Sequence, residues 1–205
     1  MGVGLTCRPQ PAVGASWPRI RRTVIVSMSS NVVPEIRVAA GCGAPRGGLL
    51  ITGRLTAPCA LGRSGIRPDK REGDGATPAG AFRLVEVLYR PDRTVKPRTA
   101  LPSLAIRPDS GWCDDPGSRF YNRPVCLPFA ASHERLWRDD RLYDLLVVLD
   151  YNLAFPRRGR GSAIFLHLAA PDFLPTAGCI AIGPTAMRRL LAVAGPSTRL
   201  VVGRL

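Results

Sequence analysis

Short apolar runs, separated by glycine and proline, dominate the hydrophobic pattern of this chain. These runs are short and are bounded by turn residues, which is typical of β-strands rather than of helices. The 21 glycines and 20 prolines favour many turns. We expect strands at 49–51, 59–61, 81–89, 104–106, 142–152 (around the buried run 145–149), 163–168, 179–182 and 199–204. The chain is therefore predicted to be mainly β.

Two segments favour helix. The segment that begins at Pro184 has a proline suited to the first turn, and Gly195-Pro196 would end it. Its apolar stripe comprises Met187, Leu190, Leu191 and Val193. Residues 132–137 suggest one or two further helical turns. A length of 205 residues without a linker or internal repeat predicts a single domain with one or two short helices.

The stretch 163–182 holds one of the two histidines and a cysteine that follows a glycine. Strand alternation places Ala163, Phe165 and His167 on one face of the first run, and Cys179 and Ala181 on one face of the second. We expect the two runs to pair as neighbouring antiparallel strands, with their bulky aliphatic faces in the core. His167 and Cys179 then emerge together on the opposite face.

A cysteine beside a histidine can act as a nucleophile with a general base. A thiol with its usual pKa of about 8.5 is mostly protonated at neutral pH, and proton transfer to a positioned imidazole is worth about 10²–10⁴ in rate. The backbone N–H groups of Gly178 and Cys179 can hold the oxyanion of an acyl-transfer intermediate, with Thr176 at the rim. From these residues alone, a buried structural cysteine is the more common arrangement.

A resemblance to a known family favours the catalytic interpretation of Cys179 over the structural one. His167 followed by Pro175-Thr176-Ala177-Gly178-Cys179-Ile180 resembles the catalytic signature of the L,D-transpeptidases of the YkuD family, in which Ser/Thr-X-Gly-Cys follows a histidine on a strand. Other segments are similar in the same order: 62–65, 75–82, 151–152 and 161–167. The resemblance implies a YkuD-like β-sandwich or mixed sheet. It also implies Cys179 as nucleophile, His167 as general base and then acid, and support of the oxyanion by Gly178, Ala177 and Thr176.

The family cross-links peptidoglycan as cysteine acyltransferases. The resemblance therefore implies peptidoglycan stem peptides as partners, no metal or cofactor, and a place in the cell envelope or periplasm. Ala177 and Ala181 depart from the family, which often has histidine at the first position and arginine or asparagine at the second, and these departures bear on how substrate is held. A hydrolase (L,D-carboxypeptidase or endopeptidase) with the same dyad stays open, because both reactions share their first half.

We expect substrate-binding side chains in the loops around this pair. The candidates are Lys70 from the glycine-rich segment 63–80, Trp112 and Asn122 from the irregular segment 108–128, Tyr151 and Asn152 before the histidine strand, and Arg160. The basic loop 157–161 would place positive charge near the thiol, where it favours a thiolate. The Asp114-Asp115 pair has no companion His or Glu at ligand spacing, so turn roles are predicted for it and no metal site.

The formal net charge of +14 comes almost wholly from arginine. Such a balance favours polyanionic partners, although an arginine-rich genome gives the same composition. No RNA-binding or helix-turn-helix signature is present, so nucleic acid is not expected as a partner. A non-catalytic binding module for an anionic polymer is the alternative to an enzyme.

The start of the chain differs from the rest. Residues 1–27 carry four arginines and no acidic residue, and we predict a disordered extension, with translation starting at Met28 and the catalytic domain at 36–205. No secretory signal peptide and no transmembrane segment are recognisable, so a cytoplasmic location stays open. The six cysteines have irregular spacings without a CxxC motif, which favours free thiols. No feature predicts the oligomeric state.

Overall fold

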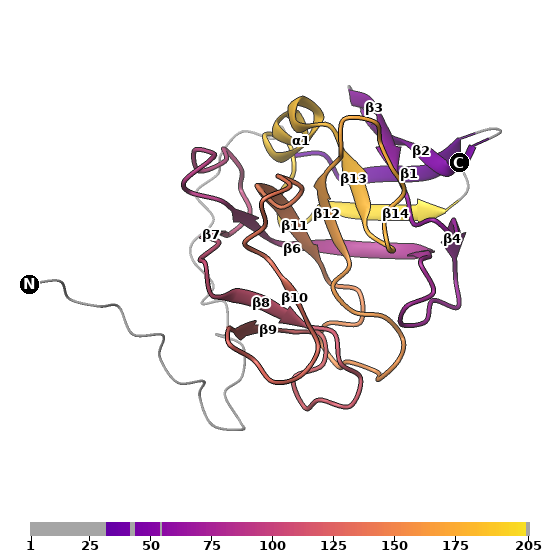
Figure 1. Cartoon of the computed structure of the whole chain (residues 1–205). Helices are drawn as coiled ribbons and strands as arrows, with labels where there is room; N and C mark the ends of the chain where they lie inside the picture. The colour runs from indigo at the N-terminus through magenta and orange to yellow at the C-terminus, as the bar shows by residue number, and fades with distance from the viewer. Residues whose placement is uncertain (1–31, 42–43, 54, 204–205) are drawn as a thin grey trace, which may run out of the picture. The chain divides into compact units, whose positions relative to one another are not determined.

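The computed structural model describes residues 32–41, 44–53 and 55–203, and its fold is mainly β, as predicted (Figure 1). The predicted extension 1–27 and Met28 lie outside the described residues. The strands are β1 (Glu35–Gly41), β2 (Ala44–Thr52), β3 (Leu55–Ala60), β4 (Ile66–Arg67), β5 (Thr77–Pro78), β6 (Gly80–Tyr89), β7 (Ser103–Ala105), β8 (Ser110–Cys113), β9 (Arg123–Cys126), β10 (His133–Arg135), β11 (Leu145–Leu149), β12 (Phe165–Leu168), β13 (Ile180–Ile182) and β14 (Arg199–Gly203).

A mixed sheet of nine strands forms the body of the domain. Its order is β11-β12-β13-β3-β2-β1-β14-β6-β7, and β11 also pairs with β6. Because β11 has a partner on both sides, the sheet closes on itself and β7 extends from β6. The pairs β1–β14, β12–β13 and β6–β7 are parallel, whereas the hairpin of β2 and β3 is antiparallel. The predicted mixed sheet is confirmed.

The strands separate two apolar clusters. The first cluster includes Ile164, Leu166, Ile180 and Ile182, and the second includes Phe165 and Cys179. All five residues of β11 are buried, with Val147 in the first cluster and Val148 in the second. A strand covered on both faces has a continuous apolar sequence, which explains the unbroken run 145–149.

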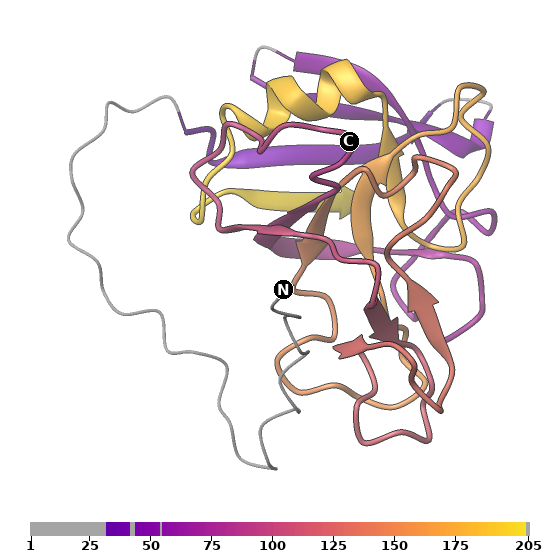
Figure 2. The same ribbon diagram turned by 60° about the vertical axis from the view of Figure 1, so that its left-hand side comes forward.

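One helix, α1 (Pro184–Leu191), follows β13 where the proline predicted it. Met187, Leu190 and Leu191 are buried in the first cluster, so the predicted apolar stripe packs against the sheet. Figure 2 shows α1, in yellow, alongside the indigo strands of the sheet.

A second, three-stranded sheet of order β10-β8-β9 corrects one prediction. Residues 132–137 were expected to be helical, but His133–Arg135 forms β10, in which Glu134 lies opposite Trp112 of β8. One or two helical turns are unstable in isolation. The free edge of β8 offers backbone hydrogen bonds instead, and these decide the structure.

The pairing of β12 with β13 also differs from the prediction: the two strands are parallel, with His167 beside Ala181. The connection 169–179 does not form a hairpin. It runs back along the sheet, where the Thr176 N–H donates to the Leu61 carbonyl at 2.9 Å and Thr176 bridges to Gly62. This anchoring returns the chain to the start of β12 before β13 begins, which makes the pair parallel.

Candidate active site

Cys179 lies immediately before β13, beside the strand that carries His167. The Phe165 N–H donates to Cys179 Sγ at 3.3 Å, and the thiol donates to the Ala163 carbonyl at 3.1 Å. Ala163, Phe165 and Cys179 share the second cluster, whereas the aliphatic residues between them in sequence face the first. The face that the alternation predicted for Cys179 is therefore confirmed, although the strands run parallel.

A cavity of about 490 Å³ joins the two residues, because both Cys179 and His167 line it. Polar side chains from distant parts of the chain complete its wall. They include Lys70, Asp114, Glu134, Arg138, Tyr143 and Thr176. A cavity with one nucleophile, one imidazole and a few converging polar groups is the usual form of a small-molecule or peptide site.

His167 has a defined proton position. Its Nδ1 lies 2.8 Å from the Leu168 carbonyl. A carbonyl oxygen only accepts, so Nδ1 carries the proton and Nε2 has a free lone pair. The Tyr143 ring meets the imidazole edge-on with centroids 5.2 Å apart and restricts its orientation. Burial lowers the pKa of His167 to about 4, against the effect of the Leu168 carbonyl, so the imidazole is neutral at physiological pH.

The thiol is also neutral at rest. Burial raises the pKa of Cys179 to about 12, and the negative charge of Glu134 acts in the same direction. The Phe165 N–H, Lys70 and Arg138 favour the thiolate and oppose this rise. The resting pair is therefore thiol and imidazole rather than thiolate and imidazolium.

Gly178 occupies a position where the backbone conformation and the lack of space disfavour any residue with a Cβ atom. Its φ is +145°, and a Cβ there would lie 2.8 Å from the Ala76 carbonyl oxygen. Its N–H donates to Thr176 Oγ1 at 3.1 Å, and that hydroxyl donates to the Cys179 carbonyl at 2.6 Å. Among the described residues the Cys179 N–H has no partner, so it is the amide ready to receive an oxyanion. Ala177 lines the cavity beside them.

Lys70 is the one predicted substrate-binding residue that lines this cavity. Its side chain is 3% exposed, and Nζ donates to Asp74 Oδ1 at 2.5 Å and to the Arg71 carbonyl at 2.9 Å. Asp74 also accepts from the N–H groups of Arg71 and Ala76. These bonds hold the pKa of Asp74 below its usual range despite burial. The glycine-rich turn is thereby fixed, and the Lys70 ammonium at the cavity is paired with Asp74.

A family model for the L,D-transpeptidase catalytic domain, YkuD, matches residues 46–202. The chain belongs to the YkuD family of L,D-transpeptidase catalytic domains. Its match includes His167, Cys179 and every cavity residue named above. The predicted family is thus confirmed, and with it the general association of the family with peptidoglycan.

Two solved structures are similar to this YkuD domain. Bd1075 of Bdellovibrio bacteriovorus is 20% identical with a TM-score of 0.42, and the match covers 85% of this chain and 48% of that one. L,D-transpeptidase 1 of Mycobacterium tuberculosis is 12% identical with a TM-score of 0.33, over 82% of this chain and 61% of that one. The chain thus spans about half of the first protein's length. No curated protein sequence matches it significantly.

Trp112 and Asn122 are buried next to the YkuD site and support it through hydrogen bonds. Their side chains are 1% and 2% exposed, and neither lines the cavity. Asn122 Oδ1 accepts from Trp112 Nε1 at 2.9 Å and from the Ala163 N–H at 3.0 Å, and its Nδ2 donates to the Tyr151 and Asn152 carbonyls. Ala163 has a φ of +50°, and its carbonyl accepts a hydrogen bond from the Cys179 thiol, so Asn122 fixes a carbonyl that Cys179 contacts.

Tyr151, Asn152 and Arg160 lie together but outside the cavity lining. The Tyr151 hydroxyl donates to the Arg160 carbonyl at 2.5 Å. Asn152 Nδ2 donates to the Arg157 and Gly161 carbonyls and its Oδ1 accepts from the Arg157 N–H. These bonds shape the basic loop 157–161. The loop was expected to bring positive charge to the thiol, but the cations that line the cavity are Arg63, Lys70 and Arg138.

Sequence reasoning missed Glu134, Arg138 and Tyr143. Tyr143 Oη donates to Glu134 Oε1 at 2.5 Å, and Arg138 lies 3.6 Å from the same oxygen. The only available signal was a cluster of charged and aromatic residues in a segment without clear periodicity. Asp114 was given a turn role, yet it lines the cavity.

Two absences complete the description of the site. In the described ranges, no three His, Cys, Asp or Glu side chains are grouped closely enough to hold a metal ion. In the part of the chain that the structure describes, no helix is long and apolar enough to cross a membrane.

Proposed function

We propose that this protein is a cysteine acyltransferase of the L,D-transpeptidase type that acts on peptidoglycan stem peptides in the cell envelope. One observation carries the proposal: Cys179 and His167 line the same cavity of a YkuD domain, and the Leu168 carbonyl leaves Nε2 of His167 as the basic nitrogen. The family supplies the substrate class, and the residues supply the chemistry of thiol acyl transfer.

In the first step, Cys179 Sγ attacks a peptide carbonyl of the donor stem. The thiol proton moves from its contact with the Ala163 carbonyl to Nε2 of His167 as the C–S bond forms. The Cys179 N–H receives the oxyanion, and one such donor is typically worth about 3–4 kcal/mol. The imidazolium then gives its proton to the leaving amine, and a thioester remains on Cys179.

In the second step, an amine of a neighbouring stem attacks the thioester and restores the thiol. The family implies that the donor bond attacked in the first step is an L,D-linked bond at the third stem residue. Water in place of the amine would give a hydrolase, which uses the same first step.

Intact mass spectrometry after incubation with a disaccharide-tetrapeptide tests the first step. We expect the wild-type protein to gain the mass of the donor less that of the released terminal amino acid, and Cys179→Ala to gain none. Cys59→Ala is the matched control, because Cys59 is buried on the neighbouring strand β3, and it should form the adduct at the wild-type rate. No adduct from folded wild-type protein would overturn the proposal.

Product analysis with and without a second stem as acceptor separates the two reactions. A cross-linked dimer supports the transpeptidase, whereas a shortened stem as the sole product in the presence of acceptor would show a hydrolase.

A further inference from the structure

The three-stranded sheet supplies the cavity with a wall whose chemistry the proposed first step does not use. Glu134 on β10 lines the cavity and accepts a hydrogen bond from Tyr143, whose ring packs against His167. Only one Glu134 oxygen, Oε1, takes part in this bond and in the ion pair with Arg138. Since the ring of Tyr143 bridges Glu134 and the imidazole, this carboxylate lies close to the reacting centre.

Asp114 adds a second carboxylate to the same wall. It follows β8, the strand that pairs with β10, and lines the cavity. Its Oδ1 is buried and has no hydrogen-bond partner in the part of the chain that the structure describes. A buried carboxylate oxygen without a partner is costly, so a donor that enters with the substrate would stabilise it.

Arginine does not neutralise this wall. Arg138, the cation beside Glu134, also pairs with Asp140 through two of its nitrogens. Burial raises the pKa of Glu134; the Tyr143 hydrogen bond and the charge of Arg138 oppose this rise, and the charges of Asp114 and Asp140 add to it. The guanidinium of Arg138 is thus shared between two carboxylates, and Asp114 has no ion pair with it, although the chain as a whole carries +14.

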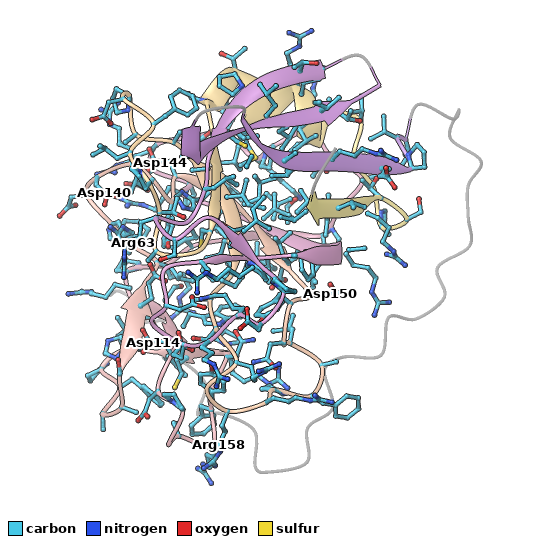
Figure 3. All side chains as sticks on the ribbon, turned by 90° about the vertical axis from the view of Figure 1, so that its right-hand side faces the viewer. Arg63, Asp114, Asp140, Asp144, Asp150 and Arg158 are labelled. Carbon is cyan, nitrogen blue, oxygen red and sulfur yellow. The ribbon has the colours of Figure 1, made fainter. Side chains whose placement is uncertain are left out.

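The remaining cations of the cavity come from another part of the chain. Arg63 and Lys70 belong to the glycine-rich turn that follows β3, whereas Asp114 and Glu134 belong to the three-stranded sheet. Figure 3 shows Arg63 and Asp114 on the same side of the molecule, with Asp150 on the other. One cavity thus presents positive charge from one segment and negative charge from another.

We propose that Glu134, with Asp114, binds the ammonium group of the acceptor amine and so selects aminolysis over hydrolysis. This inference rests on the proposed function and assigns its second step. An amine is protonated at neutral pH, and a desolvated carboxylate is the side chain that pairs with an ammonium most strongly. Arg63 is placed to attract a donor carboxylate instead, which keeps the two substrates in distinct orientations.

The proton balance of the second step fits this arrangement. The bound ammonium gives one proton to the Glu134 carboxylate, which releases it to water. The nitrogen lone pair then forms the C–N bond, and Nε2 of His167 takes a second proton. As the C–S bond breaks, the imidazolium returns that proton to Cys179, so the amide keeps one hydrogen and the thiol is restored.

Glu134→Gln separates this role from a structural one. Glutamine keeps an oxygen that accepts the Tyr143 hydrogen bond, so a residue that only supports Tyr143 would tolerate the change. Glu35→Gln at the start of β1 is the matched control, because this carboxylate does not line the cavity. For each protein the acyl-enzyme is formed with the disaccharide-tetrapeptide, and the ratio of cross-linked to hydrolysed product is measured against acceptor concentration.

We expect the ratio to fall at least tenfold in Glu134→Gln at limiting acceptor, to fall less in Asp114→Asn, and to stay unchanged in Glu35→Gln. Hydroxylamine, which is uncharged at neutral pH, should react equally fast with wild-type and Glu134→Gln acyl-enzymes. An acyl-enzyme that forms normally and partitions as in wild type in Glu134→Gln overturns this inference alone. If wild type forms no acyl-enzyme, the proposed function fails and this inference falls with it.

Discussion

Two buried cysteines lie close to one another in the sheet, one on β3 and one just before the adjacent strand β13, and they differ in the groups that surround the sulfur. Cys59 on β3 is 2% exposed and Cys179 before β13 is 9% exposed. Burial raises the pKa of both thiols to about 12. Cys59 packs among aliphatic residues of the first cluster, whereas Cys179 contacts two backbone polar groups and lines the cavity with His167.

The comparison teaches that a raised thiol pKa does not identify a nucleophile or exclude one. For Cys59, burial is the single cause of the shift. For Cys179, burial and Glu134 are opposed by an N–H group and two cations that all favour the thiolate. A thiol with such partners can be activated when substrate arrives, and a thiol in an aliphatic core cannot.

The largest expected effect that sharpens this comparison comes from His167→Ala. Loss of the general base should slow formation of the acyl-enzyme by about 10²–10⁴. Alkylation of Cys179 by iodoacetamide should change little, because the imidazole is neutral at rest and does not stabilise a resting thiolate. Peptide mapping by mass spectrometry measures both rates. An equal loss in both would show instead that His167 sets the thiol pKa.

Asn122→Ala tests whether the surroundings of Cys179 depend on a buried polar hub. The substitution removes the acceptor of Trp112 Nε1 and of the Ala163 N–H, and it leaves two carbonyls without their donor. Each orphaned buried group costs about 1–3 kcal/mol, so unfolding in urea should show a loss of about 3 kcal/mol or more.

Asn122→Asp is the informative control, because it keeps the acceptor oxygen and loses both donor bonds. It should be destabilised less than Asn122→Ala if the bond to Ala163 matters most. Normal stability in both variants, with weakened substrate binding, would restore the original prediction that Asn122 contacts substrate.

The sequence predicted which side chains of β12 are buried on each face, but it did not predict the direction of the neighbouring strand β13. The alternation from Ala163 to Leu168 placed the aliphatic side chains in the first cluster and Phe165 in the second, because burial depends on period and the period is local. The direction of β13 was missed, since it depends on Thr176 bridging to Gly62, a contact across more than a hundred residues. No local pattern encodes such a contact.

The same limit explains the cavity wall. Cys179 and Gly178 were recognisable because their chemistry is carried by adjacent residues. Glu134, Tyr143 and Asp114 meet only because β10 pairs with β8 and the three-stranded sheet packs beside β12. Trp112 and Asn122 were expected in the substrate cleft, since aromatic and amide side chains in a loop favour binding, but the hydrogen bond between them draws both into the core.

The buried imidazole of His167, which lines the same cavity as Cys179, should make the stability of the protein depend on pH. The pKa of His167 falls from 6.5 to about 4 on folding. The unfolded chain therefore binds a proton between these values that the folded chain does not, and stability present above pH 6.5 is lost as the pH falls towards 4. The shift corresponds to about 3 kcal/mol. Urea unfolding at pH 7 and pH 4 should show this loss in wild type and a smaller one in His167→Gln.

The smallest expected effect belongs to Cys59→Ala, and it addresses the comparison most directly. Removing a small buried side chain from an aliphatic cluster costs roughly 1 kcal/mol, because a small cavity replaces the sulfur. Acyl-enzyme formation should stay at the wild-type rate, since Cys59 does not line the cavity. In native protein, iodoacetamide should modify the Cys179 peptide before the Cys59 peptide. If the two peptides react equally fast, the neighbours of Cys179 do not activate it, and the difference between the two thiols disappears.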